Sequence, residues 1–513
     1  MLPGAPTSYW MESTPTTSYP SLTEDIEVDV AVLGAGIAGI STAWEVAATG
    51  RSVALLEAGR IASGVTGHTT AKLSSLHTLA YSRISRTAGA EAARLYAESQ
   101  QSAVERAATI AGQLGVDCDL ERLPGFAYAA TEAAVSQVRA EADAARAAGL
   151  DASYVTDTGL PFAVAGAVRV EHQAQFHPRK YLLGLAADLV ARGGRIFEGT
   201  RAVGLRERPQ CRVTTEQGRT VMARDVVVAT HYPVFNRALL FARLRTRREL
   251  VVAGPVPAPD DPAGIYITPE ENTRSVRTAP YRDGQRLLIV TGEHFTPGDA
   301  DVAERWERLA AWARDRFPSA DLTYRWATQD ATASDRIPFV GPFHPGTQHV
   351  HVATGFGGWG MSTGVMAGHL IAATIAGQHL PWTGLYDPRR FHPLREAGAL
   401  AGLQGHVVRH FVGDRIRPSR VRSTSDLAPG TGAVMRVGRR QLAVYRDPTG
   451  GLQSLPARCS HLGCIVHFNA AETAWECPCH GSRFDVDGTV IQGPANRALR
   501  RVDTPHRQPP DRA

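Results

Sequence analysis

The sequence predicts an α/β domain interleaved with an α+β domain in its N-terminal part, and a small all-β domain at its C-terminal end. Two observations predict this arrangement. An apolar strand at 28–33 runs directly into a glycine-rich turn and a helical stretch, as in parallel α/β sheets. From residue 425 onward, short β-like segments alternate with turns. The length of 513 residues also exceeds what one hydrophobic core holds.

The first predicted element is a βαβ unit, formed by a strand at Val28–Leu33, a helix to Ala48 and a second strand at Ser52–Glu57. Within this unit the G-x-G-x-x-G pattern predicts dinucleotide binding. The first glycine makes the turn, the second lets the backbone approach a pyrophosphate, and the third allows close helix packing. Glu57 is expected to bond ribose hydroxyls; a turn without a ligand is the alternative. The pattern consists of Gly34, Ala35, Gly36, Ile37, Ala38 and Gly39.

Further motifs indicate which dinucleotide binds. Ala58–Ala71 is small, polar and glycine-rich, which suits a loop around a cofactor. Far downstream, Ser334–Pro342 precedes a predicted strand, His349–Ala353, which leads into the glycine-rich Gly355–Gly364 and a predicted helix to Ala376. With the first glycine motif, these segments resemble the D-amino-acid-oxidase (DAO) superfamily, which includes glycine, sarcosine and glutamylputrescine oxidases. The resemblance covers about residues 8–390.

The resemblance implies FAD as the cofactor, with the Gly355–Gly364 loop and the following helix N-terminus against the flavin ring. Val226–Thr230 resembles the strand before a turn near the flavin. Some relatives attach FAD through a histidine near His68, but the register here is shifted by about one residue, which favours non-covalent binding. Besides the first glycine motif and Glu57, the resemblance assigns FAD contacts to Ala58, Ser63, Gly64, Thr66, Gly67, Thr69, Thr70, Ala229, Thr230, Gly355, Gly357, Gly358, Trp359, Gly360 and Met361.

A second domain that covers a substrate is expected within residues 72–165 and 232–330, although no substrate motif stands out there. Arg277, Tyr281 and His294 are candidates by position alone, so no catalytic residue is assigned. His177 precedes a predicted helix at Tyr181–Ala191 and is interpreted as a helix-start residue.

The predicted boundaries are 1–380 for the oxidoreductase part, 381–424 for a linker or docking helix and 425–513 for the all-β domain. Residues 1–25, rich in Ser, Thr and Pro, are expected to form an extended arm. Arg395–Val412 has amphipathic helical character with too many charges for a membrane anchor. The expected β segments of the last domain are Ala433–Val437, Gln441–Tyr445, Ser482–Asp485 and Thr489–Ile491.

Two boxes in the last domain, CSHLGC and CPCHGS, each supply one cysteine and one histidine as candidate metal ligands. Cys459 and His461 come from the first box, and Cys477 and His480 from the second. Two thiolates and two imidazoles can bind a [2Fe–2S] cluster, with the cysteines on one iron and the histidines on the other. A structural zinc site is the alternative, but C-x-H is tighter than the usual spacing of zinc fingers.

The boxes resemble the Rieske family, specifically its disulfide-containing type in cytochrome bc complexes. The match extends to Gly481-Ser482 and to Gly493-Pro494-Ala495, which resembles the loop over the cluster. The resemblance implies a disulfide between Cys464 and Cys479. Many relatives of high potential have a tyrosine where this chain has Phe484, so we expect a lower reduction potential here.

The composition is that of an ordinary globular protein, with a formal net charge of +5 and no transmembrane run. No basic block indicates nucleic-acid binding, and Arg243–Arg248 and Arg415–Arg422 are interpreted as solvated surface. The N-terminus lacks the features of a signal peptide, so a cytoplasmic location is expected. The isolated Cys118 and Cys211 are interpreted as core residues.

These features predict an FAD-dependent oxidoreductase that takes electrons from a small-molecule substrate, an amine or amino-acid-like compound. Electrons would pass from FAD to the Rieske cluster and on to an unidentified one-electron acceptor. A single dinucleotide motif agrees with an organic electron donor rather than NAD(P)H. One alternative is a redox sensor or electron-transfer adaptor. Another is a component related to Rieske oxygenases, which is disfavoured because no 2-His-1-carboxylate iron domain is apparent.

Overall fold

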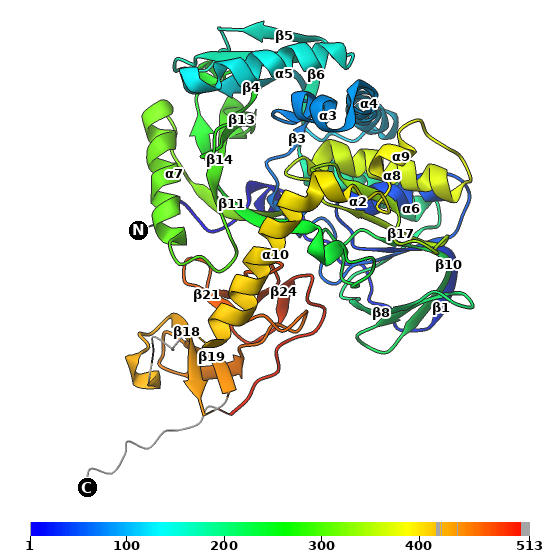
Figure 1. The fold of residues 1–513 in the computed structure, drawn as a ribbon, viewed down its shortest axis with the longest axis vertical. Helices are drawn as coiled ribbons and strands as arrows, with labels where there is room; N and C mark the ends of the chain where they lie inside the picture. The colour runs from blue at the N-terminus through cyan, green and yellow to red at the C-terminus, as the bar shows by residue number, and fades with distance from the viewer. Residues whose placement is uncertain (1, 417–420, 422, 439, 504–513) are drawn as a thin grey trace.

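The computed structural model describes residues 2–416, 421, 423–438 and 440–503, so parts of the predicted linker and the predicted residues 504–513 of the last domain lie outside the described residues. Two sheet domains form the larger body, and a small β domain lies at one end of it (Figure 1). The predicted fold class, α/β with an interleaved α+β domain and a small all-β domain, is confirmed.

The first sheet carries the βαβ unit at its centre. Its strand β1 pairs in parallel with β2 on one side and with β10 on the other. The central strands are buried on both faces, as their Val/Leu/Ala sequences predict. In spatial order the strands are β16 (Phe339–Pro342), β17 (Val350–Thr354), β10 (Thr220–Val228), β1 (Ile26–Leu33), β2 (Val53–Leu56) and β7 (Arg195–Phe197), with β9 (Cys211–Thr215) and β8 (Ala202–Arg206) added beside β10.

Helix α2 (Ile37–Ala47) leaves the glycine turn and packs against α8 (Gly360–Ile375) and α6 (Pro178–Ala191). Both α2 and α8 are apolar nearly all round, which agrees with their burial inside the domain. The predicted helix-start role of His177 is confirmed, because its side chain accepts a hydrogen bond from the backbone N–H of Lys180 at 3.3 Å. Cys118 and Cys211 are both buried in the core, as expected.

The second sheet forms the other large domain. Helix α7 (Val302–Arg316) packs on β11 and β14, and helices α3 (Ala80–Ala88), α4 (Ala90–Leu114) and α5 (Val135–Ala147) pack together between the two sheets' outer ends. The strand order is β15 (Tyr324–Ala333), β11 (Leu244–Val256), β14 (Arg286–Phe295), β13 (Arg274–Pro280), β12 (Ile265–Ile267), β4 (Glu121–Ala129), β6 (Gly166–Gln175) and β3 (Lys72–Leu73), with β5 (Ala152–Val155) beside β6.

The N-terminal arm is only partly extended, so that expectation is corrected. Tyr9–Glu12 forms the short helix α1, and the Trp10 side chain is 1% exposed. The indole N–H of Trp10 donates to the carbonyl of Thr69 at 2.7 Å. Burial of these aromatic rings anchors the arm against the segment that follows the βαβ unit.

The C-terminal domain consists of two small antiparallel sheets around a hydrophobic core of its own, which includes Trp475, Phe484 and Leu455. Helix α10 (Pro393–Ile416) runs from the larger body to this domain, and α9 (Thr383–Tyr386) precedes it (Figure 1). The described residues contain no helix long and apolar enough to cross a membrane. The strands are β18 (Thr431–Val437), β19 (Arg440–Arg446) and β20 (Leu452–Pro456) in one sheet, and β21 (His467–Asn469), β22 (Ala474–Glu476), β23 (Arg483–Phe484) and β24 (Val490–Gln492) in the other.

Candidate functional site

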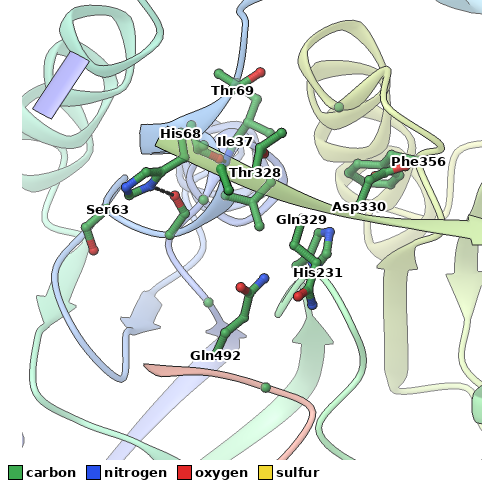
Figure 2. Close-up of a pocket in the computed structure, with 18 of the residues that line it drawn as sticks. Ile37, Ser63, His68, Thr69, His231, Thr328, Gln329, Asp330, Phe356 and Gln492 are labelled. Carbon is green, nitrogen blue, oxygen red and sulfur yellow. Dashed lines mark hydrogen bonds between the residues drawn. The ribbon is translucent and has the colours of Figure 1, made fainter. Parts of the chain in front are cut away.

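A cavity of about 720 Å³ begins at the glycine turn after β1 and extends to the second sheet. Figure 2 shows side chains from distant parts of the chain around it, among them Ile37 from α2, Asp330 from β15 and Gln492 from β24. The cavity is therefore walled by all three parts of the molecule. Its volume is in the range of sites for small molecules and cofactors.

Two helices begin at this cavity, and at neither does the side chain of the N-cap residue accept a hydrogen bond. At α2, the Thr66 hydroxyl accepts from the Ile37 N–H at 3.1 Å. Helix α2 follows Gly36, and α8 follows Trp359. Uncapped backbone N–H groups and the helix dipole favour negative charge, such as a pyrophosphate or the reduced ring of a flavin. Both helix ends thus fit the FAD that the sequence predicts.

Each glycine of the first motif is favoured at its position for a different steric reason. Gly34 has a φ of +95°, which a side chain would strain. A Cβ on Gly39 would lie 1.7 Å from the carbonyl oxygen of Gly34, so the helix can pack here only without a side chain. A Cβ on Gly36 would meet only the Thr66 hydroxyl, at 3.1 Å, and its surroundings are otherwise open to the cavity.

Glu57 lies at the end of β2 and lines the cavity. Its carboxylate accepts hydrogen bonds from the backbone N–H groups of Ala35 and Gly59, both at 2.8 Å. These bonds hold the carboxylate beside the glycine turn, where a ribose is expected, and burial raises its pKa.

Most residues predicted to contact FAD line the cavity, including the neighbours of Glu57 and the Gly357–Met361 turn. Gly39, Gly67 and Gly355 do not line it. Gly67 is confined by close approach of the Ala62 carbonyl, and Gly355 takes a φ of +77° against Leu244. The predicted residues that line the cavity are Gly34, Ala35, Gly36, Ile37, Ala38, Glu57, Ala58, Ser63, Gly64, Thr66, Thr69, Thr70, Ala229, Thr230, Gly357, Gly358, Trp359, Gly360 and Met361.

The wall from the second domain contains ionisable groups that sequence reasoning missed, among them Lys72, Glu249 and Asp330. Burial lowers the pKa of Lys72 to about 8 and raises that of Asp330 to about 8, and burial also raises the pKa of Glu249. Their strands are remote in sequence and carry no motif. The pairing of β11 with β15 brings Glu249 and Asp330 together, whereas Lys72 comes from β3 at the other end of the strand order, so the tertiary fold brings it to the same cavity.

The three positional candidates do not line this cavity. The Arg277 guanidinium donates to the carbonyl oxygens of Thr70 and Ala71, and so supports the wall from behind. Tyr281 bonds to the Tyr324 hydroxyl at 3.2 Å, and the half-buried His294 lies on β14. Their places argue for structural roles.

Cys459, His461, Cys477 and His480 come together at the edge of the C-terminal domain that faces the larger body. Both cysteines are buried with free thiols, and the two imidazole rings lie 4.9 Å apart, centroid to centroid. The buried Nδ1 atoms of both histidines have no hydrogen-bond partner in the structure. Two thiols and two unpartnered imidazole nitrogens are the donor set that a [2Fe–2S] cluster of mixed ligation needs.

The implied disulfide between Cys464 and Cys479 is present and joins the two ligand loops. The sulfur atoms of these two cysteines lie within 4.8 Å of that of Cys477. Because the disulfide occupies two of them, only Cys477 is available to a metal. This pairing leaves Cys459 and Cys477 as the thiol ligands of the candidate cluster.

The edge of the C-terminal domain that carries His461 and His480 faces the larger body, with His480 buried and His461 partly exposed. The Tyr232 ring lies 6.3 Å from the His461 ring and 6.0 Å from the His480 ring, and Nε2 of His461 lies 2.8 Å from the Asn236 side-chain oxygen. The Thr246 hydroxyl donates to the His480 carbonyl at 3.1 Å. The two candidate cofactor sites therefore face one another.

Residues that line the FAD cavity reach directly to the cluster loops. His231 lines the cavity, and its neighbour Tyr232 contacts both candidate histidine ligands. The amide of Gln329, another lining residue, donates to the Gly481 carbonyl at 3.1 Å. Figure 2 shows His231, Gln329 and Gln492 around the same cavity. Gly493 and Ala495, predicted to lie over the cluster, also line this cavity.

Arg248 corrects the interpretation of Arg243–Arg248 as solvated surface. Its side chain is 1% exposed and forms ion pairs with Glu472 and Glu476 of the C-terminal domain. Glu476 also accepts a hydrogen bond from the Gly298 backbone N–H at 2.8 Å. Arg243, likewise buried, pairs with Glu396 of α10. Arg243 and Arg248 are thus docking residues with remote acidic partners, whereas Arg245 of the same run is exposed, as the sequence interpretation expects.

Comparison with known proteins agrees with this division. Residues 29–374 match the family described as FAD dependent oxidoreductase (DAO), and residues 418–503 match the Rieske [2Fe-2S] domain. The putative Rieske 2Fe-2S iron-sulfur protein YhfW of Bacillus subtilis is 32% identical over 501 residues, which cover 97% of this chain and 98% of that protein.

Solved structures resemble the larger body. Glycine oxidase from Geobacillus kaustophilus superposes with a TM-score of 0.60 at 19% identity, covering 71% of this chain and 100% of that chain. L-amino acid deaminase from Proteus vulgaris gives a TM-score of 0.60 at 20% identity, covering 74% and 97% of the two chains. At this identity the likeness establishes the fold.

Proposed function

The chain belongs to the DAO family of FAD-dependent oxidoreductases and carries a Rieske [2Fe-2S] domain, and on this basis we propose that it oxidises the C–N bond of an amine or amino-acid-like substrate and passes the electrons through its cluster to an external one-electron acceptor. FAD, when bound, supplies the hydride acceptor, and the cluster supplies a one-electron carrier. The chain's own residues position the two groups and the substrate.

The observation that carries the relay is the contact between the two sites. His231 lines the FAD cavity, and the next residue, Tyr232, packs against both candidate histidine ligands. Gln329 bridges the same gap through its bond to Gly481. A fused carrier at such short range needs no diffusional encounter, which favours transfer inside one chain.

Under the same proposal, Cys459, His461, Cys477 and His480 bind the cluster, and the predicted glycine-motif residues with Glu57 hold FAD without a covalent bond. The cavity wall offers a cation, Lys72, and two carboxyl groups, Glu249 and Asp330. This pairing suits a compound that carries an amine and a carboxylate. The names of the structural neighbours, glycine oxidase and L-amino acid deaminase, support the same class.

An anaerobic titration tests the relay in the full chain. Candidate amino acids and secondary amines are added to protein with both groups bound, and flavin absorbance and the cluster EPR signal are followed in time. We expect flavin reduction first and cluster reduction second. Flavin reduction beside a cluster that stays oxidised, despite a favourable measured potential, would contradict the relay and favour a sensory Rieske module. No flavin reduction by any amine would contradict the substrate class.

A further inference from the structure

A second set of metal-binding side chains lies outside both cofactor sites. His410 and Asp414 stand one turn apart on α10, and His467 begins β21 of the Rieske domain. One ligand atom from each residue lies within 4.8 Å of the other two. No sequence motif marks these three residues as a set, because about fifty positions separate the pair on α10 from His467.

The distances among these atoms suit a bound cation. The Asp414 Oδ2 atom lies 2.9 Å from Nδ1 of His410 and 3.0 Å from Nε2 of His467. Zinc bonds of ~2.0–2.1 Å at tetrahedral angles separate neighbouring ligand atoms by ~3.3 Å, so the observed atoms need to move apart only slightly to admit the ion.

The second nitrogen of His467 decides how this ring faces Asp414. Its Nδ1 lies 3.3 Å from the carbonyl oxygen of Gly298, which can only accept, so a bond here requires the proton on Nδ1. In the neutral ring, Nε2 then directs its lone pair at a carboxylate oxygen. A cation between the nitrogen lone pair and the carboxylate oxygen would remove the repulsion between these two acceptors. The contact of Nδ1 with the Gly298 carbonyl fits as well, because a metal-bound histidine usually donates its other N–H to such a group.

We propose that His410, Asp414 and His467 bind one divalent transition-metal ion of the zinc class, which joins α10 to the Rieske domain. Imidazole and carboxylate donors suit Zn²⁺. Asp414 is 6% exposed at its side chain, whereas His410 and His467 are 19% and 30% exposed, which leaves one side open to a water ligand. None of the three residues lines the FAD cavity, so the ion's role is structural.

The position of the site explains what such an ion would stabilise. His406, one turn before His410, has its Nε2 atom 3.0 Å from the carbonyl of Pro478, which stands between Cys477 and Cys479. Gly298 of the larger body approaches His467 so closely that a Cβ there would lie 3.1 Å from that side chain. An ion at this point holds the linker helix, the cluster domain and the larger body in one arrangement.

Metal analysis of the full chain with both cofactors tests the site. The protein is washed with a mild chelator, given Zn²⁺ alone, desalted and measured for zinc and iron. We expect about one zinc and about two iron atoms per chain. Asp414→Asn and His467→Asn should lose the zinc and keep the iron and the cluster EPR signal. His172→Asn is the matched control, because exposed His172 also lies near a carboxylate, Asp151, at 3.7 Å, and it should keep the zinc.

Thermal unfolding gives a second readout. Zn²⁺ should raise the Tm of the unaltered chain and of His172→Asn, and leave that of Asp414→Asn unchanged. Zinc content equal in the unaltered chain and in Asp414→Asn would overturn the proposal. So would the absence of stoichiometric zinc from the unaltered chain, which would show that protons alone hold the three side chains together. A third iron in place of zinc would overturn the zinc class.

Discussion

The FAD cavity and the cluster site are built in opposite ways. The cavity is assembled from segments between Pro6 and Asn496 and includes backbone at two helix N-termini, where we propose that the phosphates and the flavin lie. The four cluster residues lie within 459–480, on two loops that one disulfide joins. A large cofactor needs an extended, mostly main-chain cradle, whereas a small inorganic cluster needs a few side chains held at fixed distances.

The contact between these sites follows a third pattern. The larger body and the Rieske domain have separate hydrophobic cores, and the surfaces between these two parts contain buried ion pairs and single hydrogen bonds. Such polar contacts define one orientation, because misplaced charges would stay buried without partners. The docking of the Rieske domain is therefore specified chiefly by particular side chains, and substitutions can separate the function of each site from the link between them.

The largest expected effect is the loss of one cofactor without the other. Cys477→Ser removes a thiolate ligand, so the cluster EPR signal should disappear while flavin absorbance remains. The control Cys118→Ala alters another buried free cysteine and should keep both signals. An intact Rieske signal in Cys477→Ser would contradict the assignment of this ligand.

The reciprocal change is Gly36→Val. The added side chain extends into the cavity where a pyrophosphate is expected, and its Cβ meets only the Thr66 hydroxyl of the protein. We expect the purified variant to contain the cluster but little FAD. FAD that is retained, or that stays attached to the unaltered chain after acid denaturation, would contradict the predicted mode of binding.

The next largest effect is expected from weakening the contact between the larger body and the Rieske domain. Arg248→Met removes one of the two arginines that pair with Glu472 and Glu476. It should destabilise the docked state by less than the about 3–5 kcal/mol expected for an unpaired buried charge, because Arg483 still pairs with both carboxylates. Burial acts to raise the pKa of the Glu472 carboxyl, but the charge of the Arg248 guanidinium acts to lower it, and the net pKa shift is downward. Transfer from flavin to cluster should slow while substrate still reduces the flavin, as stopped-flow absorbance can show. The control Arg146→Met breaks an exposed pair with Asp143, so its stability should change by about 1 kcal/mol or less.

A smaller effect is expected from Gln329→Leu, which removes the hydrogen bond to the Gly481 carbonyl. The loss of about 1 kcal/mol corresponds to roughly fivefold weaker docking and a modestly slower transfer. Redox titration should find both midpoint potentials unchanged. A changed cluster potential with an unchanged transfer rate would show that Gln329 tunes the cluster instead of its docking.

The smallest change concerns the cluster alone. Phe484 is fully buried in the Rieske core. Phe484→Tyr should raise the reduction potential by offering a hydroxyl donor to a ligand sulfur, with flavin properties unchanged. Protein-film voltammetry measures the shift, and an unchanged or lower potential would show that the residue does not occupy the position the resemblance implies.

Contiguous motifs allowed much of this molecule to be predicted. The βαβ unit, the glycine turns, the docking helix and the cluster boxes each depend on residues close in sequence, where ligand chemistry and periodicity are visible. The structure confirms the elements: β1 and α2 flank the predicted glycine turn, β2 follows α2, and α10 contains the helix predicted at Arg395–Val412. The spacing of Phe484 from the second box was likewise enough to predict that it takes the position where many relatives have a tyrosine.

Only the tertiary structure revealed which distant residues meet. Glu249 and Asp330 lie on the paired strands β11 and β15, and Lys72 reaches the same cavity from β3 at the other end of that sheet's strand order. Arg248 looked like a surface charge because its partners, Glu472 and Glu476, follow more than two hundred residues later. The sequence by itself determined the cofactor classes and the local elements, since short-range backbone and ligand geometry fix these. The packing of the domains decided the cavity wall and the buried interface, since burial and long-range pairing are properties of the folded chain.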